Sequence, residues 1–271
     1  MALIRRMVEF SELSTVFFQY WEIIVLFFIV AMLYASVGFG GGSSYLAILA
    51  LTGLSFIQFR AIALLCNIVV VSGGTFIYIR KGYFQWRKII PLTLMSVPLA
   101  FLGGYLKISQ TFFFILLGVI LVVAAVLMWI SKYLVDSSAN IKQNSISKNS
   151  FLGGFIGFIS GMVGIGGGVF LSPLLHLTHW DTPKKIAATS SFFILVNSIA
   201  GLLGQYLTYY NITDFTFDAN LALILMITVF IGGQIGSRLS ISKLSPFIIK
   251  RMTAVLIAIV GLRILWKYAL N

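Results

Sequence analysis

Long apolar stretches separated by short polar segments make up most of the sequence. A helix needs about 20 apolar residues to cross a bilayer, and eight stretches approach or exceed that length. Polar positions lie between the stretches instead of alternating with apolar ones inside them, which favours helices over a membrane β-barrel. We therefore expect an all-α polytopic membrane protein with helical segments at residues 21–54, 60–79, 89–106, 111–130, 151–177, 185–209, 219–237 and 246–268.

Two of these segments contain a glycine cluster. The first cluster reads Gly38-Phe39-Gly40-Gly41-Gly42 and the second reads Gly164-Ile165-Gly166-Gly167-Gly168. Each glycine inside a helix costs about 1 kcal/mol relative to alanine, so both segments should be broken or re-entrant at these points. In a membrane, a break survives only where protein buries it or where it lines a cavity. Breaks at matching places in two halves of a chain point to a transporter's binding site.

The chain has the pattern of an internal repeat. The second glycine cluster begins 126 positions after the first, and at an offset of 125 Ser72 falls on Asn197. The longest polar stretch lies between the two copies. We therefore expect a first membrane repeat at 1–130, a polar linker at 131–149 and a second membrane repeat at 150–271.

The Lys and Arg residues indicate how the repeats are oriented. If all eight segments cross once, they divide eleven to eight between the two sides. If each broken segment enters and leaves on the same side, thirteen of the nineteen lie on one side, together with the linker. The positive-inside rule prefers the second arrangement, in which the halves are inverted repeats.

Composition supports the membrane assignment and excludes several functions. The chain is 59% hydrophobic and 10% charged, with a net charge of +12. This charge does not indicate nucleic acid, because Lys and Arg cluster in loops. The single Cys66 excludes an internal disulfide and a cysteine-cluster metal site, and no cofactor is expected. The pattern leaves open whether the chain forms a homo-oligomer.

The polar residues at membrane depth are small and neutral. Hydroxyls, amides and the backbone N–H groups at the start of a half-helix all donate to an oxyanion, and glycine lets the backbone approach closely. The alternative is that these residues pack helices together. The residues that we expect at a substrate-binding site are Gly40, Gly41, Gly42, Ser43, Ser44, Asn67, Ser72, Gly166, Gly167, Gly168, Ser190 and Asn197.

A histidine pair offers a different chemistry. His176 and His179 have the spacing of two residues on one helix face, and such a pair could ligate a metal. No Cys, Asp or Glu cluster completes a site, so an interfacial pair beside Trp180 is the favoured interpretation. No nucleophile motif, phosphate loop or dinucleotide fingerprint occurs in a suitable context, and we expect no catalytic residue and no enzyme.

The two glycine clusters and the eight-segment layout resemble the TauE/SafE family of sulfite-exporter-like permeases. The resemblance rests on Gly38–Gly42 and on the stretch from Gly164 to Pro173, and it covers nearly the whole chain. Where the second half has Pro173, the first half has Ala47. The family implies an inner-membrane permease for sulfite, sulfonates or related small organic anions, often moved outward.

We therefore expect a multi-pass permease in a cell membrane. The resemblance implies that this is a bacterial inner membrane. It would hold a small anion between the two glycine breaks and move it as an exporter. Three alternatives remain at this point. The first is a passive anion channel, the second is a membrane enzyme that uses His176 and His179, and the third is a structural assembly subunit without transport.

Overall fold

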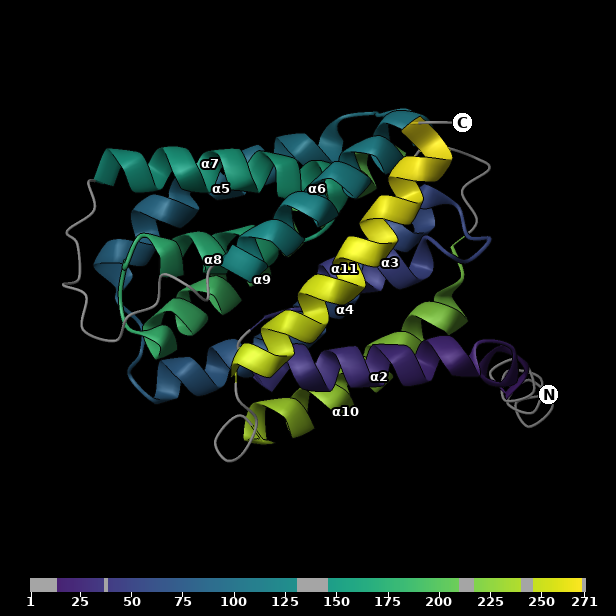
Figure 1. The fold of residues 1–271 in the computed structure, drawn as a ribbon, viewed down its shortest axis with the longest axis horizontal. Helices are drawn as coiled ribbons and strands as arrows, with labels where there is room; N and C mark the ends of the chain where they lie inside the picture. Colours follow the sequence, from purple (N-terminus) through teal and green to yellow (C-terminus); the bar gives the residue numbers. More distant parts are fainter. Residues whose placement is uncertain (1–13, 37–38, 131–145, 210–216, 240–245, 270–271) are drawn as a thin grey trace.

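The computed structural model describes residues 14–36, 39–130, 146–209, 217–239 and 246–269, and these contain helices and no strand. Figure 1 shows the arrangement of the helices. Their bounds are α2 (Trp21–Ser36), α3 (Gly42–Leu49), α4 (Phe56–Arg80), α5 (Trp86–Tyr105), α6 (Gln110–Ile130), α7 (Ile146–Val163), α8 (Gly168–Leu177), α9 (Pro183–Tyr209), α10 (Ala219–Leu239) and α11 (Pro246–Ala269).

Among the described residues, five helices are long and apolar enough to cross a membrane: α4, α5, α6, α9 and α10. The outer surfaces of the helices carry many exposed large apolar side chains, as lipid-facing surfaces do. The fold class predicted from the sequence, an all-helical polytopic membrane protein, is confirmed. The first half was predicted less well at one boundary, because α4 begins at Phe56 and so places Arg60 inside a helix.

Both glycine clusters interrupt a helix, as predicted. The helix α2 ends at Ser36 and α3 begins at Gly42, while α7 ends at Val163 and α8 begins at Gly168. The residue before each new helix is a glycine with positive φ, Gly41 at 90° and Gly167 at 84°. Only glycine adopts this conformation without steric cost, so the clusters supply the sharp turn that starts each half-helix.

Glycines also determine how closely α5 and α7 pack. A Cβ atom on Gly153 would collide with the backbone of Leu92, and one on Gly161 would collide with that of Ala100. Both residue numbers rise together, so α5 and α7 run in the same direction. Small residues at such contacts let membrane helices approach backbone to backbone.

The helix pair α2 and α10 packs in the same way. Gly232 lies against Phe28 and Gly236 against Met32, so these two helices are also parallel and in close contact. In each pair, a helix that carries a glycine break in one half of the chain packs against the third long helix of the other half. The two halves are therefore interleaved through these pairs.

The direction of each helix follows from further contacts. Asn197 of α9 lies at Ser96 of α5, and Thr208 lies at Tyr105, so α9 is parallel to α5 and therefore to α7. The short α8 must then run back between α7 and α9. In contrast, α4 and α9 run in opposite directions, because Gln205 contacts Ile57 at one end and a Cβ on Gly74 would meet Ser191 at the other. An inverted repeat would produce this arrangement.

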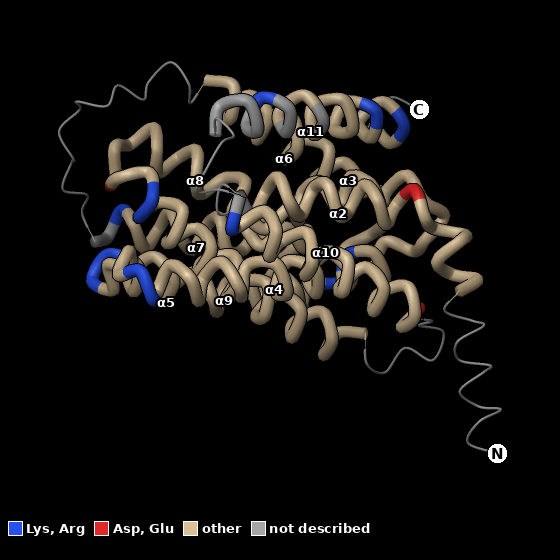
Figure 2. Tube along the Cα trace, turned by 90° about the horizontal axis from the view of Figure 1, so that it is seen from below, with Lys and Arg blue, Asp and Glu red and all other residues tan. Residues whose placement is uncertain are grey.

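One group of positive charges lies near the start of α5. Figure 2 shows Lys and Arg, drawn in blue, grouped near α5, with others on α11. Lys88 in this region forms an ion pair with Asp181, which follows α8. The end of α8 therefore lies beside the start of α5.

Candidate functional site

Asn67 of α4 lies between the two glycine breaks. Its side-chain Nδ2 donates a hydrogen bond to the carbonyl oxygen of Ile165 at 2.9 Å. A Cβ on Gly40 would lie 2.7 Å from Asn67 Oδ1, and one on Gly166 would lie 3.1 Å from Asn67 Nδ2. Both breaks therefore approach one amide that is fully buried. Glycine is needed at these positions because a larger residue would displace that amide.

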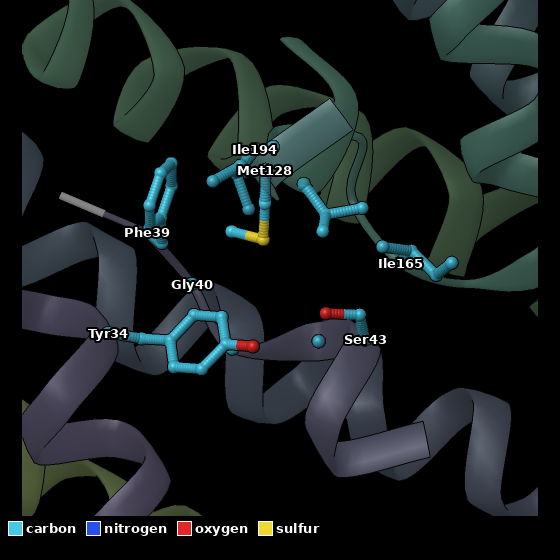
Figure 3. A pocket seen from close by; sticks show the side chains of 11 residues that line it. Tyr34, Phe39, Gly40, Ser43, Met128, Ile165 and Ile194 are labelled. Carbon is cyan, nitrogen blue, oxygen red and sulfur yellow. The ribbon is translucent and has the colours of Figure 1, made fainter. Parts of the chain in front are cut away.

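A small cavity lies between the two breaks. Figure 3 shows Tyr34 and Ser43 on one side of it, facing Met128 and Ile194, with Phe39 beside the latter pair. Its volume, about 10 Å³ for the centre of a water molecule, is close to the least space that holds one water. This is a closed conformation without room for an oxyanion. The complete lining is Tyr34, Phe39, Gly40, Gly41, Gly42, Ser43, Met128, Ile165, Gly168, Val169 and Ile194.

Two helices begin at this cavity. Gly42 and Ser43 start α3, Gly168 and Val169 start α8, and all four line the cavity. Neither helix has a side-chain hydrogen bond that caps its first turn. The first N–H groups of a helix have no partner inside the helix, and the helix dipole places partial positive charge there. The two positive helix ends therefore meet at the same place.

Several hydroxyl groups near the breaks are buried without a partner among the described residues. Ser43 Oγ, Ser160 Oγ and Ser198 Oγ have no hydrogen bond, and neither does Asn67 Oδ1. Ser198 lies at Gly166, since a Cβ there would be 2.6 Å from its Oγ. Buried polar atoms are normally satisfied, so this group of unpartnered atoms near the two glycine breaks is unusual.

The structure brings most of the predicted site residues together. Gly40, Gly41, Gly42, Ser43 and Gly168 line the cavity. Asn67 and Gly166 lie directly behind them. The two remaining residues of the breaks have packing partners: Gly167 lies against Phe193, and the Ser44 hydroxyl is 2.6 Å from that of Tyr34.

The last three predicted residues are also absent from the lining of this cavity. Asn197 accepts a hydrogen bond from Ser96 and donates one to the Phe193 carbonyl at 2.8 Å, so its amide joins α5 to α9. Ser72 is exposed, and its hydroxyl donates to the carbonyl of Val69 within its own helix. Ser190 is buried, and its hydroxyl has no partner among the described residues.

Sequence reasoning missed the apolar wall of the cavity and one charge. Tyr34, Phe39, Met128 and Ile194 look like ordinary core residues in sequence, and no pattern separates them from the rest. Ser198 follows the predicted Asn197, and the helical period could have identified it as facing the break. Arg60 is fully buried in α4, although its position in the sequence indicated a loop boundary.

The histidine pair is arranged differently from the prediction. The helix α8 ends at Leu177, so His179 lies beyond it with φ at 50°, and the two residues do not share a helix face. In the part of the chain that the structure describes, no three His, Cys, Asp or Glu side chains are grouped so that they could hold a metal ion.

An ion-pair cluster holds the end of α8. Asp181 Oδ2 lies 2.6 Å from Lys88 Nζ, and Asp181 Oδ1 lies 3.4 Å from Lys185 Nζ. Burial raises the pKa of Asp181, but hydrogen bonds from Lys88 and from the Thr182 N–H, with the charges of both lysines, outweigh burial and hold this pKa below its usual value. The carboxylate therefore stays ionised.

Comparison with known proteins agrees with this architecture. The family described as "Sulfite exporter TauE/SafE" matches residues 23–264. A probable membrane transporter protein of Sinorhizobium fredii is 32% identical over 246 residues, which cover 89% of this chain and 96% of that protein. One from Methanocaldococcus jannaschii is 25% identical over 257 residues, covering 89% and 93%. No solved structure matches the chain. The protein belongs to the sulfite exporter TauE/SafE family of membrane transporters.

Proposed function

We propose that the protein is a permease that exports a small anion, namely sulfite, an organosulfonate or a related organic anion. The anion would be held between the two glycine breaks. The observation that carries this proposal is the meeting of two uncapped helix N-termini at one cavity, of which no lining residue is acidic. Helix N-termini attract anions through free N–H groups and through the helix dipole.

The hydrogen-bond donors at the cavity can bind an anion without holding it too tightly to be released. Backbone N–H groups of Gly42 and Gly168, with the hydroxyl of Ser43, can replace part of the hydration shell of an oxyanion. Each hydrogen bond to a charged group contributes about 1.5–3 kcal/mol. A transported ion must also leave, and neutral donors bind it less tightly than a fixed cation at the same place would.

Transport requires the cavity to open. The breaks now touch through Asn67, and the cavity between them has space for about one water molecule. An anion can therefore enter only when α3 and α8 move apart. We propose that these half-helices open alternately to the two sides of the membrane, as alternating access requires.

Reconstitution into proteoliposomes tests this proposal. Vesicles loaded with sulfite, an aliphatic sulfonate or a small carboxylate should release at least one of these anions at a rate that saturates with concentration. External unlabelled anion should accelerate the exchange of labelled anion, which separates a carrier from a passive channel. Release that rises linearly with concentration and shows no counterflow would favour the channel, and no release of any anion would refute the proposal.

The enzyme alternative is tested in the same vesicles. We propose that the chain has no catalytic activity, in accordance with relatives named as membrane transporters. Replacing both His176 and His179 with alanine should leave transport intact. A chemically altered anion in the medium, lost in this double variant, would contradict the proposal.

A further inference from the structure

Arg60 is a buried positive charge in the membrane-spanning part of the protein. It lies in the second turn of α4 and is 0% exposed. One of its nitrogens, Nη2, is 3.4 Å from the carbonyl oxygen of Gly161, which makes a weak hydrogen bond. Its Nε and Nη1 are buried without any hydrogen-bond partner in the described residues. Two of the three guanidinium nitrogens therefore have no hydrogen-bond partner among the described residues.

Among the residues that the structure describes, no neighbour of Arg60 supplies a negative charge. The guanidinium lies 5.5 Å from the ring centre of Phe113, and the side chain beside it that can form a hydrogen bond is the hydroxyl of Tyr209. The ion pairs found among the described residues involve Asp181 and not Arg60. Burying an uncompensated charge costs several kcal/mol, and intramembrane ionisable residues generally serve transport or binding.

The other half of the chain shows what is missing. Lys185 lies 125 positions after Arg60, an offset one residue shorter than that of the two glycine clusters. In the second half, Asp181 pairs with Lys185, four residues later in the chain. The corresponding position in the first half, again 125 residues earlier, is Phe56. The first half thus keeps the cation and has a phenyl ring in place of the carboxylate.

The position of Arg60 relates it to the glycine breaks. Arg60 and Asn67 are seven residues apart and share one face of α4, separated by about 10 Å along the helix. Asn67 donates its hydrogen bond to Ile165. Arg60 lies against Gly164, since a Cβ added to this glycine would be 3.5 Å from the Cβ of Arg60. The second break therefore runs along this face from one residue to the other. Arg60 lies toward the start of α4, away from Lys88 and the start of α5.

We propose that Arg60 forms a second anion-binding position, which receives the anion after it leaves the cavity on its way outward. The transported anion itself then provides the counter-charge that no described residue supplies. The Nε and Nη1 donors bind its oxygen atoms while the Gly164 turn moves. This inference rests on the proposed anion transport, and the experiment is designed to separate the two.

The test compares purified variants in detergent and in proteoliposomes, with sodium sulfite as the probe and sodium gluconate at equal ionic strength as the reference. Arg60→Met removes the cation. Phe56→Glu keeps the arginine and adds an internal carboxylate one turn away, copying the Asp181–Lys185 pair. Phe56→Gln has nearly the same shape without the charge. Lys185→Met removes the matched cation of the second half, and Arg60→Lys retains the charge.

We expect sulfite to raise the melting temperature of the wild type. Arg60→Met and Phe56→Glu should need at least ten-fold more sulfite for the same rise, and their efflux per folded molecule should fall at least ten-fold. Phe56→Gln and Lys185→Met should respond as the wild type does, and Arg60→Lys should recover part of the efflux. Without sulfite, Phe56→Glu should melt higher than Phe56→Gln, because the new ion pair satisfies the arginine.

The outcomes separate the two proposals. A wild type that exports sulfite, together with Phe56→Glu at full efflux and full sulfite response, refutes the role of Arg60 alone. That comparison holds even if Arg60→Met does not fold, since Phe56→Glu leaves the arginine in place. A wild type that exports no anion of the panel and is stabilised by none refutes the proposed function, and the role of Arg60 with it.

Discussion

The side-chain amide of Asn67 donates a hydrogen bond to the carbonyl oxygen of Ile165, which lies 98 residues later in the chain. This bond attaches the second glycine break to α4. The Oδ1 atom of the same amide is buried without a partner among the described residues and lies beside Gly40 of the first break. One side chain therefore contacts both breaks, and its removal should affect both.

Replacement of Asn67 with alanine should reduce transport more than folding. The change removes the bond to Ile165, whose loss costs about 1–3 kcal/mol when the buried carbonyl is left unpaired. We expect efflux per folded molecule to fall at least ten-fold, as measured in proteoliposomes after size-exclusion chromatography. The matched control is Thr228→Ala, because the Thr228 hydroxyl bonds only within its own helix, to Ile224. Equal efflux of the two variants would remove Asn67 from the site.

The cavity wall can be tested by adding one methyl group at Gly168. Gly168 is not among the glycines with positive φ, but its Cβ would collide with Cδ1 of Ile194 and lie 2.5 Å from Cγ1 of the same residue, so the Ile194 side chain must move to make room. Gly168→Ala should fold with this side chain shifted, and its methyl group beside the first N–H groups of α8 should lower efflux several-fold. Gly74→Ala is the control, since its Cβ would have ordinary contacts only.

Replacing Gly41 or Gly167 with leucine is a weak test of anion binding at the breaks. Both positions have positive φ, so any side chain strains the turn and lowers the folded yield. A leucine at Gly118, outside both clusters, would not serve as a control for these variants, because the Cβ there would already collide with Leu265 at the contact between α6 and α11. Normal efflux of well-folded Gly168→Ala would argue against anion binding at the start of α8.

Asn197 and Ser96 should act as a pair that joins α5 to α9. Each single alanine variant should lower the unfolding free energy by about 1–3 kcal/mol, because one buried polar partner is left unmet. The double variant should cost less than the sum of the two, since the interaction is lost only once. Melting temperatures of the three variants measure this coupling. If Asn197→Ala keeps its stability and loses efflux, the residue instead contacts the anion.

The direction of the half-helices leads to a topology prediction. With re-entrant breaks, a tag in the linker at Asn144 and a tag near Lys184 should be labelled from the same side of the membrane, and a tag near Asn211 from the opposite side. Accessibility to an impermeant reagent in intact cells makes the measurement. Labelling of Asn144 and Lys184 from opposite sides would rule out the inverted repeat and leave the helical fold unaffected.

The ion pairs of Asp181 predict how stability depends on pH. Its pKa is lower in the folded protein than in the unfolded chain, so its contribution is present above the unfolded value, about 3.9, and is lost as pH falls through the folded value. Asp181→Asn should therefore destabilise the protein at pH 7, and the difference from the wild type should shrink below about pH 4. A difference that is independent of pH between 3 and 7 would contradict this assignment.

Much of the fold could be predicted because the bilayer restricts the choices. Long apolar runs must be helices, and a glycine cluster inside such a run must be a break. The site was predictable as far as the backbone forms it, since the glycines that line the cavity are those of the clusters. Its side-chain wall was not, because Tyr34, Met128 and Ile194 come from three different helices and have no local signal.

The errors have similar physical causes. Matching the repeat placed Ser72 and Asn197 at equivalent positions. Equivalent positions in the sequence do not have equivalent surroundings, because α4 and α9 pack against different neighbours. Ser72 therefore faces outward, and Asn197 faces α5. Arg60 was assigned to a segment end, because a charge normally stops an apolar run. The helix in fact begins one turn earlier, at Phe56.

The parallel pairs α5–α7 and α2–α10 have a consequence for biosynthesis. When the ribosome has completed residue 130, α2 and α5 are already in the membrane, but the helices that cover their glycine-contacting faces have not been translated. The first half must wait in lipid, with these faces open, until α7 and α10 arrive. Two genes, one for each half, should therefore yield active protein only when they are expressed in the same cell.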